Sequence, residues 1–210
     1  MGVTTWLDRI TDESNLWLSA SKAEEAKDHA GASVQYLNDA SECLSRGSKV
    51  RAALSCYCAA GCLSKMGAVS DSKKLYHEAG RLYAAIADHN VSGSIREALW
   101  ALQRSYGCFT LAGSAKDSET VFQAHRLLSR RANPFNDGSS WLEMPKVAGI
   151  RREDGKKAGQ TDTPLEVEGA IDRFMAMVRS DEQETAVRVA KFRRRGGMSN
   201  GPESLVSQLG

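Results

Sequence analysis

Residues 61–76 of this chain read GCLSKMGAVSDSKKLY, and residues 107–122 read GCFTLAGSAKDSETVF. Five aligned positions are identical at an offset of 46 residues (61 to 107), and the alignment needs no gap. The match extends upstream to Ser48 and Ser94 and downstream to Leu82 and Leu128. A period of this length is typical of repeats in which each unit is a pair of helices that buries its apolar face against its neighbours. The pattern therefore predicts an all-α fold, a right-handed stack of antiparallel helix pairs.

Glycine, proline and capping residues predict where these helices begin and end. Hydroxyl and carboxylate residues at helix starts satisfy free backbone amides, and glycine tolerates the left-handed conformation that follows a helix. The first 133 residues contain no proline, which suits long helices. The expected helices run from a capping box at Ser21 to Gly47, over 48–66, over 70–89, from a second capping box at Ser94 to Gly113, and from Ser114 or Asp117 to Asn133.

Composition changes divide the chain into five predicted parts. Residues 134–163 are rich in Gly, Ser, Pro and charged side chains, which is typical of a linker. Thr163 and Pro164 then combine a capping box with proline at the first helical position. The expected parts are an N-terminal amphipathic cap (1–20), a helical-repeat domain (21–133), a linker (134–163), a C-terminal helix (164–195) and a disordered tail (196–210).

Small and aromatic residues on paired helices resemble those of the tetratricopeptide superfamily, and the longer unit is similar to the helical layers of proteins related to the soluble NSF attachment protein. The period is about 46 residues rather than the tetratricopeptide value of about 34. The resemblance covers about residues 21–133 and implies an adaptor that holds a peptide or protein on a concave surface. Its carriers are Tyr36, Ala40, Ala59, Ala60, Gly61, Leu63, Gly67, Tyr76, Ala79, Gly80, Tyr83 and Gly113.

The N-terminal residues Trp6, Leu7, Ile10 and Trp17 form a short amphipathic pattern. One interpretation is a helix that caps the open end of the stack, because repeat arrays need end caps. The alternative is a wedge that docks on a membrane surface or a partner, since tryptophan suits interfaces. The sequence leaves both open.

Three cysteines, Cys56, Cys58 and Cys62, lie close together, with Cys43 upstream. Cys58 and Cys62 would share one face of a helix and could chelate a metal ion. However, structural zinc sites space their cysteine pairs differently, and Cys62 recurs as Cys108 in the second copy. Buried free cysteine acts as a small apolar residue, so core packing is the favoured interpretation. Free thiols, and an N-terminus without a signal-peptide pattern, favour a cytoplasmic protein.

A cationic run near the C-terminus is a candidate contact for nucleic acid or anionic membranes. Cations at the end of a helix also complement its dipole and remain solvated, which needs no ligand. The formal net charge of +2 does not indicate a nucleic-acid-binding protein. The candidate residues are Arg188, Lys191, Arg193, Arg194 and Arg195.

The sequence favours a non-catalytic scaffold over an enzyme. It contains no phosphate-binding loop after a strand, no nucleophile elbow and no histidine pair at metal-binding spacing. We expect no cofactor and no small-molecule substrate, one or more protein partners, and self-association that covers the ends of a short stack. Aromatic side chains often anchor interfaces, so the candidate protein-binding residues are Tyr36, Tyr76, Tyr83 and Trp100.

Overall fold

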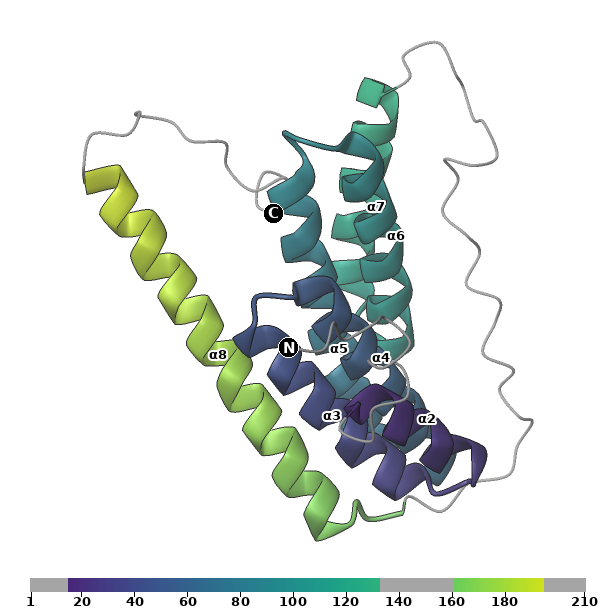
Figure 1. Cartoon of the computed structure of the whole chain (residues 1–210). Helices are drawn as coiled ribbons and strands as arrows, with labels where there is room; N and C mark the ends of the chain where they lie inside the picture. The colour runs from purple at the N-terminus through teal and green to yellow at the C-terminus, as the bar shows by residue number, and fades with distance from the viewer. Residues whose placement is uncertain (1–14, 133–160, 195–210) are drawn as a thin grey trace, which may run out of the picture. The chain divides into compact units, whose positions relative to one another are not determined.

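A computed structural model describes residues 15–132 and 161–194, with side chains up to residue 183 in the last segment. These residues form seven helices and no strand, which confirms the all-α prediction for this part of the chain (Figure 1). The helices are α2 (Leu16–Glu25), α3 (His29–Ser45), α4 (Lys49–Met66), α5 (Val69–Asn90), α6 (Ile95–Ala112), α7 (Ala115–Ala132) and α8 (Leu165–Arg194).

The chain divides into two compact units. Unit 1 includes α2, α3, α4, the start of α5 up to Leu75 and α8 up to Ser180. Unit 2 includes the rest of α5 from Tyr76, then α6, α7 and the end of α8 from Asp181. Helix α2 spans the predicted limit between residues 20 and 21, and the division into five parts stays a prediction.

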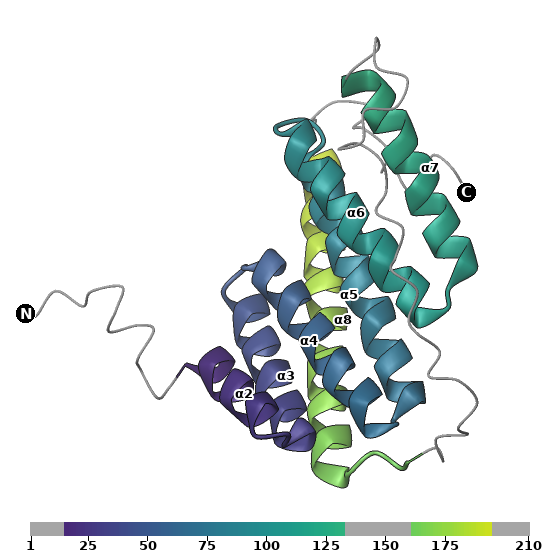
Figure 2. The same cartoon turned by 90° about the vertical axis from the view of Figure 1, so that its right-hand side faces the viewer.

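In unit 1, α3 packs against both α2 and α4, and these three helices lie side by side in both views (Figures 1 and 2). Small side chains allow the close approach, because ridges of small residues fit into shallow grooves. On α4 the fully buried positions include four alanines: Ala52, Ala53, Ala59 and Ala60. The larger apolar residues of α4 lie partly in the core and partly at the surface.

The first predicted helix is wrong in its limits. Ser21 lies inside α2 rather than at a helix start, and the helix is interrupted between α2 and α3. Lys27 adopts a positive φ of 63°, and the Asp28 carboxylate accepts a hydrogen bond of 2.9 Å from the amide of Gly31. Asp28 is therefore the residue that caps the long helix α3.

The helix limits from α4 to α7 follow the offset of 46 residues. Helix α6 begins and ends 46 residues after α4 (49 to 95, 66 to 112), and α7 begins 46 residues after α5 (69 to 115). Gly67 and Gly113 end the first helix of each copy with φ of 85° and 77°. In both copies the amide of this glycine and the amide of the following residue donate hydrogen bonds to carbonyls of the last helical turn, which is the Schellman pattern. The duplicated sequence therefore specifies duplicated helix ends.

In unit 2, α6 packs against α7, and the two run side by side in Figure 2. Helices α5 and α6 meet at Gly80, where the Ser105 hydroxyl donates a hydrogen bond of 2.8 Å to the Gly80 carbonyl. A Cβ atom at Gly80 would lie only 2.9 Å from the ring of Phe109. Glycine at this position is therefore what lets the backbone of α5 approach α6.

The part of α8 that belongs to unit 1 contributes to its core. Its buried residues recur at helical spacing, and Phe174 is fully buried. Just before the helix, the Thr163 hydroxyl donates a hydrogen bond of 2.5 Å to Asp71, and Thr161 donates one of 2.8 Å to the Met66 carbonyl. The core residues of this part are Val167, Ala170, Ile171, Phe174 and Val178.

Several predictions concern residues that the structure does not describe. They include the apolar pattern of Trp6, Leu7 and Ile10, most of the linker, the C-terminal tail and Arg195. Among the described helices, none combines the length and the apolar character that a bilayer span requires.

Candidate functional site

The four aromatic candidates lie in different environments. Tyr36, Tyr76 and Tyr83 are buried, and their role in protein binding stays a prediction. Tyr36 packs edge to face with Trp17, and its hydroxyl donates a hydrogen bond of 3.1 Å to Glu24. Only Trp100 is exposed, with 38% of its surface accessible.

Trp100 is held at the surface of unit 2 by two neighbours. The ring of Tyr83 meets it edge to face, with 5.7 Å between ring centroids and an interplanar angle of 85°. The Arg104 guanidinium lies 5.7 Å from its centroid, within the range of cation–π attraction. Such contacts fix the indole while part of it faces solvent. An aromatic side chain fixed in this way loses little conformational entropy when a partner covers it.

In unit 1, a row of large apolar side chains on α4 is also exposed. Val50, Leu54 and Tyr57 are 46%, 36% and 37% exposed. Their spacing of four and three residues places them on one side of the helix, and we call this surface the α4 face. The apolar pattern of this helix does not by itself indicate that these three residues are exposed. The signal for their exposure is the set of small alanines on the opposite side, since helices pack closely there.

The side of the α4 face next to α2 is fixed by Arg51. Its guanidinium lies 4.5 Å from the centroid of the Trp17 ring, and its Nε donates a hydrogen bond of 3.1 Å to Asp39. Asp39 also accepts a hydrogen bond from the buried Ser55 hydroxyl. Further along α4, the Lys65 ammonium donates a hydrogen bond of 2.5 Å to Glu24. The start of the described chain is thereby held close to the α4 face.

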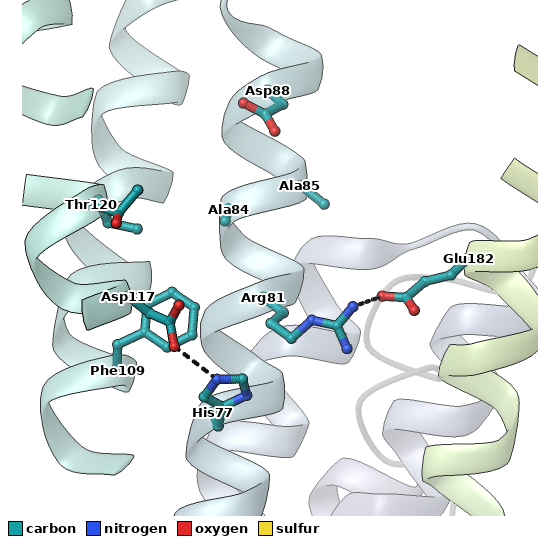
Figure 3. Close-up of a pocket in the computed structure, with 10 residues that line it drawn as sticks. His77, Arg81, Ala84, Ala85, Asp88, Phe109, Asp117, Thr120 and Glu182 are labelled. Atoms are coloured by element: carbon teal, nitrogen blue, oxygen red, sulfur yellow. Dashed lines mark hydrogen bonds and ion pairs between the residues drawn. The ribbon is translucent and has the colours of Figure 1, made fainter. Parts of the chain in front are cut away.

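Unit 2 contains a pocket of about 420 Å³ beside α5 (Figure 3). Two side-chain pairs lie on it: the His77 Nε2 atom is 3.1 Å from Asp117 Oδ2, and the Arg81 guanidinium donates to Glu182. Arg81 also contacts Glu78, at 3.3 Å. The remaining lining residues are Ala84, Ala85, Asp88, Phe109, Thr120 and Val121.

The side-chain pairs of this pocket do not form an activated nucleophile. The Ser114 hydroxyl donates to Asp117 Oδ2, the same oxygen that contacts His77, so serine and histidine share the carboxylate. A catalytic triad instead requires the histidine to lie between the hydroxyl and the carboxylate. The hydrogen bond from Ser114, together with His77, lowers the pKa of Asp117. The geometry keeps this carboxylate ionised and paired.

The cysteines are free thiols, and most are buried. Burial raises the pKa of Cys58 to about 11 and the pKa of Cys62 and Cys108 to about 12. The described residues hold no cluster of three or more His, Cys, Asp or Glu side chains placed to bind a metal ion. These positions agree with the packing interpretation of Cys62 and Cys108.

We expect Cys62 and Cys108 to resist alkylation in the folded protein. The thiolate is the reactive form, and a raised pKa together with burial reduces both its fraction and its access. Iodoacetamide at pH 7.5 should therefore modify these two thiols at least about 100-fold more slowly than in urea-unfolded protein. Peptide mass spectrometry over time measures each rate. Equal rates in the folded and unfolded protein would contradict the buried packing of both thiols.

The buried His125 predicts a loss of stability in mild acid. Desolvation lowers the pKa of His125, and its Nε2 has no hydrogen-bond partner among the described residues. The unfolded chain binds the proton near pH 6.5. The stability that the neutral, buried imidazole of His125 provides is therefore fully present above pH 6.5 and is lost as the pH falls through the lowered pKa. The free energy of unfolding should fall by up to about 1.4 kcal/mol per pH unit in that window.

Urea unfolding of the original protein and of His125→Leu between pH 7.5 and 5 tests this expectation. The substitution removes the titrating group and should flatten the dependence. An unchanged slope in His125→Leu would assign the acid sensitivity to other groups.

The cationic candidates lie in the last turns of α8. The helix includes Arg188, Lys191, Arg193 and Arg194, and their side chains are outside the described part of the structure. Their contact with a polyanion therefore stays a prediction.

No family model, no curated protein and no solved structure matches this chain.

Proposed function

We propose that this chain is a non-catalytic helical scaffold that binds another protein through the exposed sides of α4 and α6. The observation that carries the proposal is the equivalence of Leu54 and Trp100. They occupy the same position in the two copies of the sequence pattern (54 + 46 = 100), on the first helix of each copy. Both are exposed, at 36% and 38%.

Exposure of one large apolar residue is ordinary, but its recurrence at an equivalent position is a stronger indication of a binding surface. On α4, Val50 and Tyr57 extend this position into a row at the spacing that a docked helix uses. On α6, Trp100 is the residue type most enriched at binding hot spots, and Arg104 beside it is also of an enriched type. Together these features support recognition of a protein surface.

The proposed architecture is a right-handed stack of antiparallel helix pairs like that of tetratricopeptide and attachment-protein layers. The identical lengths of α4 and α6 and the shared left-handed glycines support it. In such a stack the first helices of successive pairs line one surface. The five free thiols support a cytoplasmic setting for this scaffold.

Photo-cross-linking in cells tests this function. A benzophenone amino acid is placed at Leu54 or Trp100, and in control proteins at Ser64 or Thr110. The control pair is also exposed, lies on the same two helices and is also related by the offset of 46 residues. We expect one shared protein cross-linked from positions 54 and 100 and not from 64 or 110. Equal cross-linking from all four positions, or from none, would contradict the proposal.

A further inference from the structure

Two arginines flank Trp100 on the exposed side of α6. Arg96 lies one turn before Trp100 and Arg104 one turn after it, and all three side chains are exposed. Neighbours in this row are four positions apart, or about 6 Å along the axis, so the row follows one side of the helix. We propose that this row, which we call the α6 row, binds an acidic segment of the partner in which an apolar side chain lies between carboxylates. The inference rests on the proposed function and names the chemistry of the partner at α6.

Neither arginine of the α6 row has a carboxylate partner within the described residues. No ion pair or side-chain hydrogen bond there involves Arg96 or Arg104, and Arg104 contacts only the Trp100 ring, 5.7 Å from its centroid. Glu97 follows Arg96 in sequence, but adjacent residues of a helix point in different directions, and these two form no ion pair. Each guanidinium therefore keeps its five N–H donors for an acceptor outside the described structure.

The position of Arg96 is unfavourable for α6 itself. Arg96 is the second residue of the helix, where the aligned peptide dipoles place partial positive charge. A cation at this end lowers the stability of the helix, whereas the carboxylate of Glu97 in the same turn suits it. A residue that breaks a local rule and has no compensating contact in its own chain is expected at a functional position.

The equivalent positions of α4 carry no charge. The offset of 46 residues relates Val50 to Arg96 (50 + 46 = 96) and Cys58 to Arg104 (58 + 46 = 104). The duplicated helix pattern therefore requires no cation at either position. Both copies have a large exposed apolar residue at the centre of the row, and only α6 adds an arginine on each side of it. The segment that binds α6 consequently needs carboxylates in addition to an apolar side chain.

A carboxylate suits these arginines because a guanidinium can donate two parallel hydrogen bonds to it. An apolar side chain placed on Trp100 also removes water from the space between the two arginines, which strengthens their attraction for the carboxylates. A single-stranded nucleic acid fits less well, since its binding uses a series of aromatic rings along a basic groove. The α6 row offers one ring, and Arg104 lies over it.

Photo-cross-linking from Gln103 tests the composition of the bound segment. Gln103 lies between Trp100 and Arg104 in sequence and is partly exposed, so a benzophenone amino acid there leaves the α6 row intact. The whole chain is expressed in cells, and the cross-linked partner peptide is sequenced by mass spectrometry. We expect at least two Asp or Glu residues, and no Lys or Arg, within about four positions of the cross-linked residue, or one helical turn on either side.

A synthetic peptide of the cross-linked sequence, labelled with fluorescein, is then titrated with the purified protein. Arg96→Gln with Arg104→Gln should raise the Kd about tenfold, because two charge-assisted contacts are lost. The matched control is Arg126→Gln with Arg130→Gln, which removes two exposed charges from α7 in the same unit and should change the Kd less than about twofold. A peptide with amides in place of its carboxylates should bind the original protein and the Arg96→Gln, Arg104→Gln variant equally.

The outcomes separate this inference from the proposed function. An equal loss of affinity in both pairs of variants would assign binding to the diffuse positive charge of unit 2 and would overturn the inference. A cross-linked segment without carboxylates, or a cross-link from Gln103 to nucleic acid, would also overturn it. A protein still captured from positions 54 and 100 would leave the proposed function standing in these cases. If no protein is cross-linked from position 54, 100 or 103, the proposed function fails and this inference fails with it.

Discussion

Gly80→Ala should lower the free energy of unfolding by about 1–3 kcal/mol, whereas Gly107→Ala should raise it by about 0.5–1 kcal/mol. The first substitution puts a Cβ atom 2.9 Å from the Phe109 ring, in the buried contact between α5 and α6. The ring is itself buried and has little room to move. At Gly107 a Cβ atom meets nothing within 4 Å, so alanine only improves helix propensity.

Urea unfolding followed by circular dichroism measures both changes. A double variant, Gly80→Ala with Phe109→Leu, provides a further control because the smaller side chain makes room for the new methyl group. We expect Gly80→Ala to cost less in the Phe109→Leu background than in the original protein. If Gly80→Ala stabilises the protein as Gly107→Ala does, then α5 and α6 do not approach at Gly80.

Phe174→Ala should destabilise the protein by about 3–5 kcal/mol, the usual cost of removing a fully buried phenylalanine ring. Phe174 is fully buried, on the part of α8 that belongs to unit 1. Leu165, at the start of the same helix, is 85% exposed and provides the control. Leu165→Ala should change the free energy of unfolding by less than about 0.5 kcal/mol.

This pair of variants tests whether α8 is part of the core, and denaturant midpoints measure it. The result has consequences for truncation, because a protein shortened before α8 would lose the same ring. Equal, small effects of Phe174→Ala and Leu165→Ala would show that α8 does not pack in unit 1.

Helix ends were the most predictable part of the fold. Left-handed backbone at Gly67 and Gly113 costs glycine little, so the residue and the conformation coincide. At Ser94 the side chain accepts a hydrogen bond from the Glu97 amide, as its capping box predicts. These interactions involve residues close in sequence, and local patterns can therefore specify them.

The interruption between α2 and α3 shows where a local sequence pattern competes with contacts between residues that are distant in sequence. Ser21 and Glu24 match a capping box, yet Glu24 pairs with Lys65 and with Tyr36. Those contacts join residues 41 and 12 positions apart, so a short window of sequence cannot specify them. Lys27 takes the left-handed conformation without glycine, which leaves no composition signal.

The candidate surfaces depended on packing that the sequence alone does not provide. Tyr83 and Trp100 are both aromatic residues on helices, and only the packing of α5 against α6 buries one and exposes the other. The pocket beside α5 brings Arg81 to Glu182, 101 residues away. The two side-chain pairs of this pocket do not match any sequence motif, so no pattern in the sequence indicates them.

Affinity capture with paired variants is the most direct measurement of the central claim, that equivalent exposed positions on α4 and α6 bind protein. The test protein carries Leu54→Glu with Trp100→Glu, and the control carries Ser64→Glu with Thr110→Glu. Both add two carboxylates to the same helices at exposed positions, and circular dichroism verifies that both fold. We predict that the protein cross-linked from positions 54 and 100 is retained by the original chain and by the control, and that the test protein loses it by at least about tenfold. Equal retention by all three proteins would contradict the claim.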